Sequence, residues 1–331
     1  MNIGVIGGGS WGTTIAHLLS RRFAVTLWAR NPQTIDNINL DHTNPRFLGD
    51  AELSAKLKGT TNLQFATQSA DLLVVAIPAQ QFRAVLTDAE PFLQPGISIV
   101  SLSKGLEIET GSRMTEIIEQ VCPRQTAALL TGPNLAQEIM AGYAAASVIA
   151  TRTDRLQREL QDVFHSPLFR VYTNDDIIGC ELGGVLKNIV AIAAGMSDGL
   201  GAGDNTRSAI ITRGLAEMTR LGIAMGAKSE TFAGLAGLGD LIATCTSEKS
   251  RNHTVGFKLG QGMTMSDIHR DMYMVAEGVK SAPAVMRLAE QFKVEMPIAS
   301  EVTQLVTGQR DIQQSFKALL RAGIGREDEP F

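Results

Sequence analysis

Two patterns of apolar residues divide the chain. Over roughly the first 175 residues, short β-branched and aliphatic runs alternate with stretches whose apolar residues recur every three or four positions. Strands separated by helix-length segments pair in parallel and build a doubly wound α/β sheet. The predicted strands are Asn2–Ile6, Val25–Ala29, Leu72–Ala76, Ile97–Ser101, Ala128–Thr131, Ser147–Ile149 and Phe169–Tyr172. The predicted helices between them are Gln80–Glu90, Ser112–Val121, Asn134–Met140 and Arg155–Phe164.

From Ile177 onward the strand pattern disappears and only helical spacing remains. We therefore expect two domains, an α/β domain over residues 1–176 and an all-α domain over residues 177–331. The helices predicted in the second domain are Glu181–Met196, Thr206–Leu221, Phe232–Thr244, Val255–Gln261, Gly278–Gln291 and Ile298–Thr307.

The first predicted strand runs directly into Gly7-x-Gly9-x-x-Gly12, and an apolar helical pattern follows. In a dinucleotide site the first glycine allows a tight turn and the second lets the backbone approach a pyrophosphate, while the third packs the helix against the strand. Plain glycine-rich turns can show the same spacing, and the chain has 32 glycines. The position between a strand and a helix favours a Rossmann-like dinucleotide-binding domain.

The end of the second predicted strand bears on the choice of dinucleotide. Arg30 stands there, 18 residues after Gly12 (30 − 12), where an Asp or Glu usually accepts from the adenosine ribose of NAD. A carboxylate repels a 2′-phosphate, whereas a guanidinium binds it in a forked geometry. The alternative is an ordinary solvated arginine; we expect NADP in preference to NAD.

Composition and charge exclude several classes of protein. The 331 residues include 44% hydrophobic and 19% charged residues, which is typical of a well-packed globular protein. A formal net charge of −4 argues against nucleic-acid partners, and no uninterrupted apolar run is long enough for membrane insertion. Three scattered cysteines without metal-ligand spacing, and a strand that begins at Asn2, lead us to expect a cytoplasmic protein without a metal. Formation of a homodimer is left open by the sequence.

Lys187 is the only cationic residue in the apolar helix predicted over Glu181–Met196. On that helix it shares a stripe with Gly184, Ala191 and Ala194, small residues that let a ligand or another backbone come close. Apolar surroundings destabilise the charged form of an amine, which suits an acid or base catalyst. The alternative is a lysine that reaches from a buried helix to water.

Lys104 follows a predicted core strand, at the sheet edge where doubly wound folds bind their ligands. A cation there can orient a substrate oxygen or phosphate, and the alternative is an ordinary loop lysine.

A second set of polar residues lies between Asp240 and His253. Ser250 or Asn252 can cap the helix that follows, and its free amides together with Arg251 would hold a small phosphate dianion. Asp240 can form a salt bridge or set the charge of a nearby lysine. Most serines and asparagines before a helix are caps only, so the pattern alone leaves both interpretations open.

A set of short blocks spread over nearly the whole chain forms one family pattern. The blocks are Gly7-Gly-Gly-Ser-Trp-Gly12-Thr, Ser103-Lys-Gly-Leu-Glu107, Thr131-Gly-Pro-Asn134, Glu181-Leu-Gly-Gly-Val-Leu-Lys-Asn188, Asp198-Gly-Leu-Gly-Ala-Gly-Asp-Asn205, Ala236-Gly-Leu-Gly-Asp240, Thr244-Cys-Thr-Ser and Ser250-Arg-Asn252. Together they resemble the bacterial-type NAD(P)-dependent glycerol-3-phosphate dehydrogenase family. The blocks of the second half are more specific than the glycine fingerprint.

The resemblance implies reversible reduction of dihydroxyacetone phosphate to sn-glycerol 3-phosphate, the backbone of glycerophospholipids, with NADP(H) and also NAD(H) as cofactor. In the family pattern Lys187 contacts the substrate and is its proton donor and acceptor. The other substrate-binding positions are Lys104, Gly132, Asn134, Asp240, Ser250, Arg251 and Asn252. The cofactor-binding positions are Gly7, Gly9, Ser10, Trp11, Gly12, Arg30, Lys104, Ala136, Arg251, Val275 and Glu277. Asn134 departs from the serine or threonine usual in the family.

Two other functions fit parts of the pattern. A hydroxyacid or ketopantoate-type reductase shares the two-domain plan and the lysine on the first helix after the nucleotide domain, so only the residues around Arg251 separate it from the family above. A redox sensor that holds NADP without turnover needs no buried amine, so the presence of Lys104 and Lys187 argues against it.

Overall fold

The computed structural model describes residues 1–272 and 276–321, and the chain divides into two compact units. The sheet unit comprises Met1–Lys104 and Arg113–Ile177. The helical unit comprises Gly105–Ser112 and the chain from Ile178 onward. The single boundary expected after residue 176 thus omits the short segment Gly105–Ser112. This segment belongs with the helices because its fully buried Leu106 packs into their core.

Every strand predicted from the sequence is present in the sheet unit. The strands are β1 (Asn2–Ile6), β2 (Ala24–Trp28), β3 (Lys58–Thr60), β4 (Leu72–Val75), β5 (Ser98–Ser101), β6 (Thr126–Thr131), β7 (Ala145–Ala150) and β8 (Phe169–Asn174). They form one eight-stranded sheet in the order β3-β2-β1-β4-β5-β6-β7-β8. The sequence pattern does not predict the edge strand β3. Its three residues are too few to show an alternation of apolar and polar side chains.

Neighbouring strands are parallel except β6 and β7, and for this pair the predicted parallel pairing is wrong. Between them lies one short helix, α7 (Ala136–Met140). A parallel crossover has to travel back along the strand, which is about 20 Å long at about 3.3 Å per residue. Five helical residues rise only about 7–8 Å. The short connection favours an antiparallel neighbour, and β7 runs in the opposite direction to β6.

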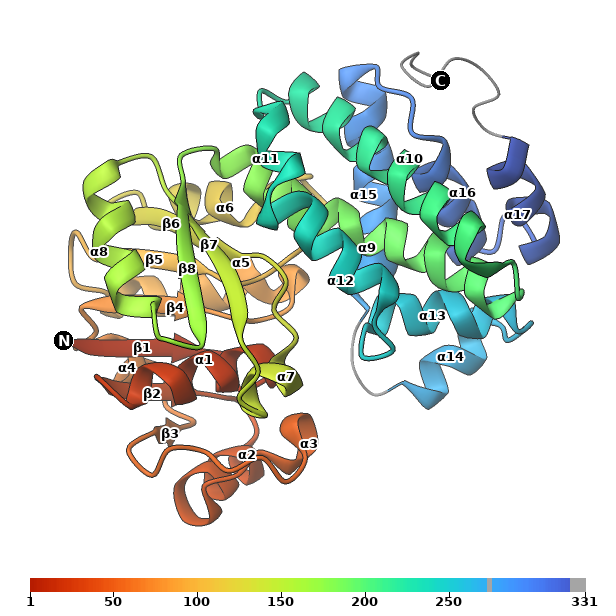
Figure 1. Ribbon diagram of the computed structural model, residues 1–331. Helices are drawn as coiled ribbons and strands as arrows, with labels where there is room; N and C mark the ends of the chain where they lie inside the picture. The colour runs from red at the N-terminus through yellow and green to blue at the C-terminus, as the bar shows by residue number, and fades with distance from the viewer. Residues whose placement is uncertain (273–275, 322–331) are drawn as a thin grey trace. The chain divides into compact units, whose positions relative to one another are not determined.

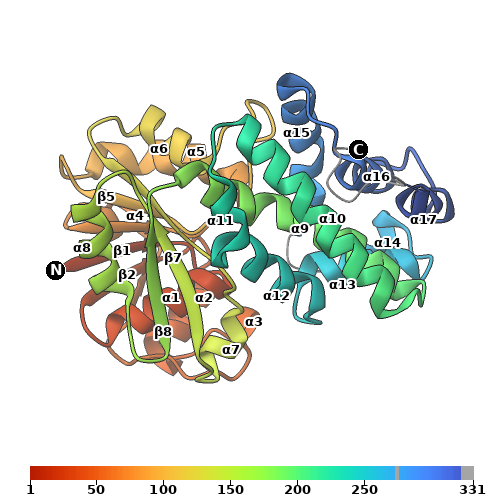
Figure 2. The same cartoon turned by 45° about the horizontal axis from the view of Figure 1, so that its top comes forward.

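Helices cover both faces of the sheet (Figures 1 and 2), which confirms the doubly wound α/β fold. Along β4, Leu72 and Val74 pack with residues of α1 and α8, whereas Leu73 and Val75 pack with residues of α5 and α6. Successive strand residues point to opposite faces, so each strand contributes to both cores. The helical elements are α1 (Ser10–Ser20), α2 (Pro32–Asp36), η1 (Asn37–Asp41), α3 (Pro45–Leu48), α4 (Leu63–Thr67), α5 (Ala79–Ala89), η2 (Glu90–Phe92), α6 (Met114–Val121), α7 and α8 (Asp154–Phe164).

Most of the candidate site residues of this unit lie along one edge of the sheet. Strands β2, β1, β4, β5 and β6 are adjacent and parallel, so their carboxyl ends lie along the same edge. The loops that follow these strands carry Gly7–Gly12, Arg30, Lys104 and Gly132–Asn134. Ligands of doubly wound sheets bind at this edge.

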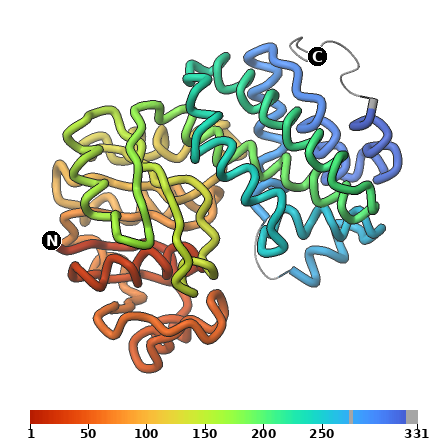
Figure 3. The backbone as a smooth tube through the Cα atoms, in the orientation of Figure 1, coloured from red at the N-terminus to blue at the C-terminus, as the bar shows by residue number. Residues whose placement is uncertain are grey.

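The helical unit contains no strand in its described part. The coils of its successive helices can be followed in the coloured tube of Figure 3. The helix predicted over Phe232–Thr244 is interrupted, because Gly234 is extended and a π-helical turn follows it. The elements are α9 (Ile177–Gly199), α10 (Gly203–Ala224), α11 (Ser229–Ala233), η3 (Leu235–Gly239), α12 (Asp240–Thr246), α13 (Arg251–Gly260), α14 (Met265–Asp271), α15 (Glu277–Phe292), α16 (Pro297–Val306) and α17 (Ile312–Arg321).

Helix α9 is the central helix of this unit, and nearly all of its residues are buried. By length and composition it could cross a membrane, although Glu181 and Lys187 interrupt its apolar residues, as the expectation of no uninterrupted apolar run states. Its apolar character has another physical reason, since 94% of its most apolar 18-residue window is buried inside the protein. The core helix of a globular unit faces apolar neighbours on every side and therefore carries apolar residues all round.

Glycines bring α9 and α13 into direct backbone contact. A Cβ atom on Gly195 would lie 2.0 Å from the His253 carbonyl oxygen, and one on Gly256 would lie 2.0 Å from the Ile192 carbonyl oxygen. No other residue type fits at this separation. The crossing holds the N-terminus of α13, with Arg251 and Asn252, beside the middle of α9.

Candidate active site

The turn after β1 has the geometry that a dinucleotide pyrophosphate requires. Gly7 has a φ of +123°, which only glycine adopts without strain. A Cβ on Gly12 would lie 2.0 Å from the Gly7 carbonyl oxygen, whereas one on Gly9 would meet no atom within 4 Å. Helix α1 begins immediately after Gly9, so the backbone amides of its first turn point toward this space. The residues present fit the group.

Ser10 and Trp11 lie at the start of α1. The Ser10 hydroxyl donates to the Phe47 carbonyl at 3.1 Å, and the Trp11 ring packs at a tilt against Phe169. Helix α7, which begins with Ala136, packs against α1. The structure thus places these three predicted cofactor positions on elements that touch one another.

Arg30 is exposed at the carboxyl end of β2. Its guanidinium donates to the Gln81 side-chain oxygen at 2.7 Å. Gln81 lies on α5, which follows β4 at the same sheet edge. The guanidinium is therefore held over the carboxyl ends of the strands, where the adenosine half of a dinucleotide binds.

Lys104, Gly132 and Asn134 come together in the sheet unit. The Lys104 ammonium donates to the Gly132 carbonyl at 2.8 Å. Asn134 is hydrogen-bonded to the Ser147 hydroxyl, which in turn donates to the Thr131 carbonyl. The Asn134 side chain is thus fixed by a hydrogen bond to β7, and through Ser147 it is linked in turn to β6.

In the helical unit, Lys187 is buried and its ammonium binds two side chains of α12. Its Nζ lies 2.5 Å from Asp240 Oδ1 and 2.7 Å from Thr244 Oγ1. Asp240 is 1% exposed and Lys187 is 6% exposed, so the pair is shielded from water. The Thr244 hydroxyl donates to the Asp240 carbonyl at 2.6 Å, which leaves its lone pairs toward the lysine. Lys187 does not extend to water.

A second contact joins the residue after Lys187 to α13. The Asn252 amide donates to Asn188 Oδ1 at 2.9 Å, and Asn252 Oδ1 accepts from the Gly278 backbone at 2.9 Å. Asn188 is itself anchored on the Gly184 carbonyl. Three helices, α9, α13 and α15, are thus tied together beside Lys187.

Arg251 and Ser250 stand at the start of α13. The Ser250 hydroxyl accepts from the His253 amide at 3.3 Å, so of the two predicted caps Ser250 is the one used and Asn252 lies within the helix. Arg251 is an exposed residue. Partial burial of its guanidinium lowers the pKa of that group, and the negative charge of Glu277, at the start of α15, raises it.

Cys245 lies directly after Thr244 and is fully buried. Burial raises the pKa of its thiol to about 12; the charge of Lys187 lowers that pKa and the charge of Asp240 raises it. The thiol therefore stays protonated near neutral pH.

Two of these side chains, Asn188 and Thr244, were not singled out from the sequence. A signal exists for both: Asn188 is an amide on an otherwise apolar helix, and Thr244 stands one helical turn after Asp240, on the same face. Val275, a predicted cofactor position, lies outside the described residues.

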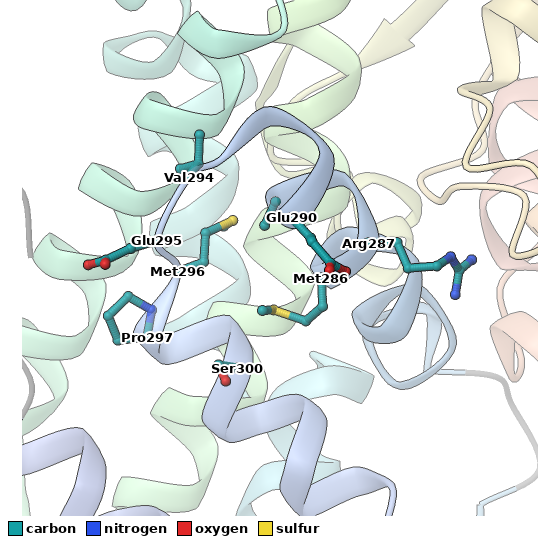
Figure 4. Close-up of a pocket in the computed structure, with 9 residues that line it drawn as sticks. Met286, Arg287, Glu290, Val294, Glu295, Met296, Pro297 and Ser300 are labelled. Atoms are coloured by element: carbon teal, nitrogen blue, oxygen red, sulfur yellow. The ribbon is translucent and has the colours of Figure 1, made fainter.

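A hollow of about 520 Å³ between the end of α15 and the start of α16 shares no residue with this site. Figure 4 shows the Arg287 side chain directed away from its neighbours there, and the guanidinium donates to the Ile108 carbonyl. The lining is otherwise made by residues such as Met286, Met296 and Ser300.

Comparison with known proteins identifies the family. Residues 2–157 match the model for the N-terminus of NAD-dependent glycerol-3-phosphate dehydrogenase, and residues 176–317 match the model for its C-terminus. A glycerol-3-phosphate dehydrogenase [NAD(P)+] of Sphingopyxis alaskensis is 53% identical over all of this chain and 99% of its own length. The chain belongs to the NAD-dependent glycerol-3-phosphate dehydrogenase family.

Further members of the glycerol-3-phosphate dehydrogenase family are similar over nearly their full length. One from Mycobacterium avium is 47% identical over 98% of this chain and 95% of its own. The crystal structure of the enzyme from Coxiella burnetii, 35% identical, superposes with a TM-score of 0.93 over 97% of this chain and 98% of its own. The family and the two-part fold expected from the sequence are thereby confirmed.

Proposed function

We propose that this protein catalyses the reversible reduction of dihydroxyacetone phosphate to sn-glycerol 3-phosphate with NAD(P)H. It is an oxidoreductase of a family whose members carry that activity in their names. The observation that supports the reaction best is the buried Lys187 ammonium, held by Asp240 and Thr244 in the same unit as the exposed Arg251. The substrate requires a proton donor for its carbonyl oxygen and a ligand for its phosphate, and the helical unit offers Lys187 and Arg251 for these roles.

Lys187 is the proton donor for reduction. When bound, the nicotinamide supplies the hydride to the carbonyl carbon. Negative charge then builds on the carbonyl oxygen, and the Lys187 ammonium stabilises that charge and transfers its proton. In the reverse direction the neutral amine accepts the proton of the alcohol. The Asp240 carboxylate, 2.5 Å away, stabilises the ammonium, and Thr244 fixes its direction.

Arg251 is the phosphate ligand, with Asn252 and Ser250 beside it. A guanidinium binds phosphate through two parallel hydrogen bonds, and an exposed one is accessible to a ligand. The Ser250 hydroxyl still has its proton to donate, because its oxygen is an acceptor in the cap. Lys104, Gly132 and Asn134 are the substrate positions that the family pattern assigns to the sheet unit.

NADP is the preferred cofactor. Members of the family are named for use of NAD(P)+, and the exposed Arg30 guanidinium at the end of β2 supports a 2′-phosphate there. Gly7, Gly9, Gly12, Ser10 and Trp11 line the turn for the pyrophosphate.

The assay follows the absorbance of NADPH and of NADH with dihydroxyacetone phosphate, and with ketopantoate as the competing substrate. We expect rapid oxidation of NADPH, slower oxidation of NADH at equal concentration, and none with ketopantoate. Turnover of ketopantoate alone would support the other reductase class. Binding of NADPH without any turnover would support a sensor and overturn the proposal.

A further inference from the structure

We infer that Asn44 is a positioning residue for the cofactor, because its side-chain amide holds the glycine turn after β1 in the conformation that receives a pyrophosphate. Asn44 precedes α3 and is completely buried. Its Nδ2 donates to the Gly8 carbonyl at 3.0 Å and to Thr13 Oγ1 at 2.9 Å. One amide group therefore binds both the middle of the glycine turn, at Gly8, and the start of α1, at Thr13.

The side chain gives up its usual role to make these contacts. Asn44 stands at the N-cap of α3, where an asparagine normally accepts from its own helix, yet its side chain makes no capping hydrogen bond. Instead it reaches to residues 36 and 31 positions earlier in the chain. The Gly8 carbonyl can only accept, so the amide nitrogen must face it and the orientation of the amide is determined. Its oxygen, Asn44 Oδ1, is buried without a partner in the described residues.

Peptide geometry connects this contact to the ligand. A peptide unit is planar and trans, so its carbonyl and its N–H point in opposite directions. Holding the Gly8 carbonyl on Asn44 directs the Gly9 N–H away from the protein interior. The space beside Gly9 is open, because nothing lies within 4 Å of the position of a Gly9 Cβ. The hydrogen bond thus aims a backbone donor into the space where a phosphate oxygen would lie.

A third contact holds the same segment against the turn. The Ser10 hydroxyl donates to the Phe47 carbonyl at 3.1 Å, and the Phe47 and Leu48 amides donate back to the Asn44 carbonyl. The segment from Asn44 to Leu48 therefore stabilises the glycine turn, although it lies outside the glycine motif. The Gly-x-Gly-x-x-Gly spacing alone does not predict this contact.

The test rests on the cofactor use proposed above and measures NADPH binding by fluorescence, without substrate. The variants are Asn44→Ala and Asn44→Leu, of which the second keeps the side-chain volume. We expect the Kd for NADPH to rise at least tenfold in both. The KM for NADPH should rise by the same factor, while kcat at saturating NADPH and the KM for dihydroxyacetone phosphate stay within threefold of their original values. A purely structural role would lower the melting temperature without this split.

The matched control is Asn39→Ala. Asn39 also ties its segment to a glycine backbone, through two hydrogen bonds to Gly59, but that glycine lies on the edge strand β3. Its Kd for NADPH should change less than twofold. Folded Asn44 variants that bind NADPH with unchanged affinity would overturn the inference. If neither variant folds, Asn44→Asp keeps the shape of the side chain but cannot donate to the Gly8 carbonyl when ionised, and an unchanged Kd in that variant also overturns the inference. An unaltered protein that binds NADPH but does not reduce dihydroxyacetone phosphate would refute the proposed reaction and leave this inference standing.

Discussion

Among single side chains, Lys187 carries the largest predicted effect. Lys187→Ala removes the proton donor but leaves the glycine turn of the sheet unit intact. We expect kcat to fall about 10³-fold, within the range for loss of a general acid, with the Kd for NADPH unchanged. Steady-state kinetics and NADPH fluorescence measure the two quantities. Lys280→Ala, an exposed lysine of α15, serves as the control and should keep full activity. A Lys187→Ala protein with normal turnover would remove the lysine from the mechanism.

We expect Arg30 to decide which dinucleotide is preferred. Arg30→Asp replaces a ligand of the 2′-phosphate by a charge that repels it and that accepts from the ribose hydroxyls of NADH. We expect kcat/KM for NADPH to fall by about tenfold or more and that for NADH to rise, so that the preference reverses. The kcat/KM for NADH, measured on the same variant, is the control for the kcat/KM for NADPH. Equal losses with both would show that Arg30 does not read the 2′-phosphate.

At the scale of elements, the close crossing of α9 and α13 positions the proposed phosphate ligands Ser250, Arg251 and Asn252. Gly256→Ala places a methyl group against the Ile192 carbonyl, where the Cβ would lie only 2.0 Å away. Separation of the helices would cost roughly 1–3 kcal/mol and stretch the Asn188–Asn252 hydrogen bond. We expect a lower melting temperature together with a raised KM for dihydroxyacetone phosphate.

The control for this substitution is Gly234→Ala. Gly234 has extended backbone angles, and the nearest atom to its Cβ position is 3.4 Å away, so an alanine there fits. It should leave both quantities nearly unchanged. If Gly256→Ala behaves in the same way, the close crossing does not hold the phosphate ligands in place.

For the molecule as a whole, the two units should respond to pH with opposite signs. In the sheet unit, burial and then the charge of Arg21 lower the pKa of His17 from 6.5 to about 4. The unfolded chain therefore binds this proton first, and stability is lost as the pH falls from 6.5 toward 4.

In the helical unit, burial raises the pKa of Glu217 from 4.5 to about 7, although it accepts from the Ile298 and Ala299 amides and lies near Arg220 and Arg213. The folded state holds this proton longer than the unfolded state does, so stability is lost as the pH rises from 4.5 to 7.

Hydrogen exchange resolved by unit, between pH 4.5 and 6.5, measures both effects. With rising pH we expect amides of the sheet unit to gain protection and those of the helical unit to lose it, by at most about 1.4 kcal/mol per pH unit for each group. His17→Gln and Glu217→Gln should flatten the respective slopes. Slopes of one sign in both units would contradict the assignment.

The sequence by itself determined the fold class, the seven longer strands, the dinucleotide turn and the apolar helix that carries Lys187. Each of these follows from residues that are close together in the chain: alternation within a strand, glycine spacing in one turn, or apolar neighbours on one helix. The family pattern added the expected reaction and its residues, because its blocks are read one by one along the chain.

The tertiary structure decided the contacts between residues that lie far apart in the chain. Lys187 meets Asp240 across 53 positions, and Asn252 meets Asn188 across 64, so no local period contains either pair. The reversed direction of β7 followed from the reach of α7, and the grip of Asn44 on Gly8 followed from how its segment folds back. Local patterns state which face of an element is apolar; only packing states which side chains of two elements share a hydrogen bond.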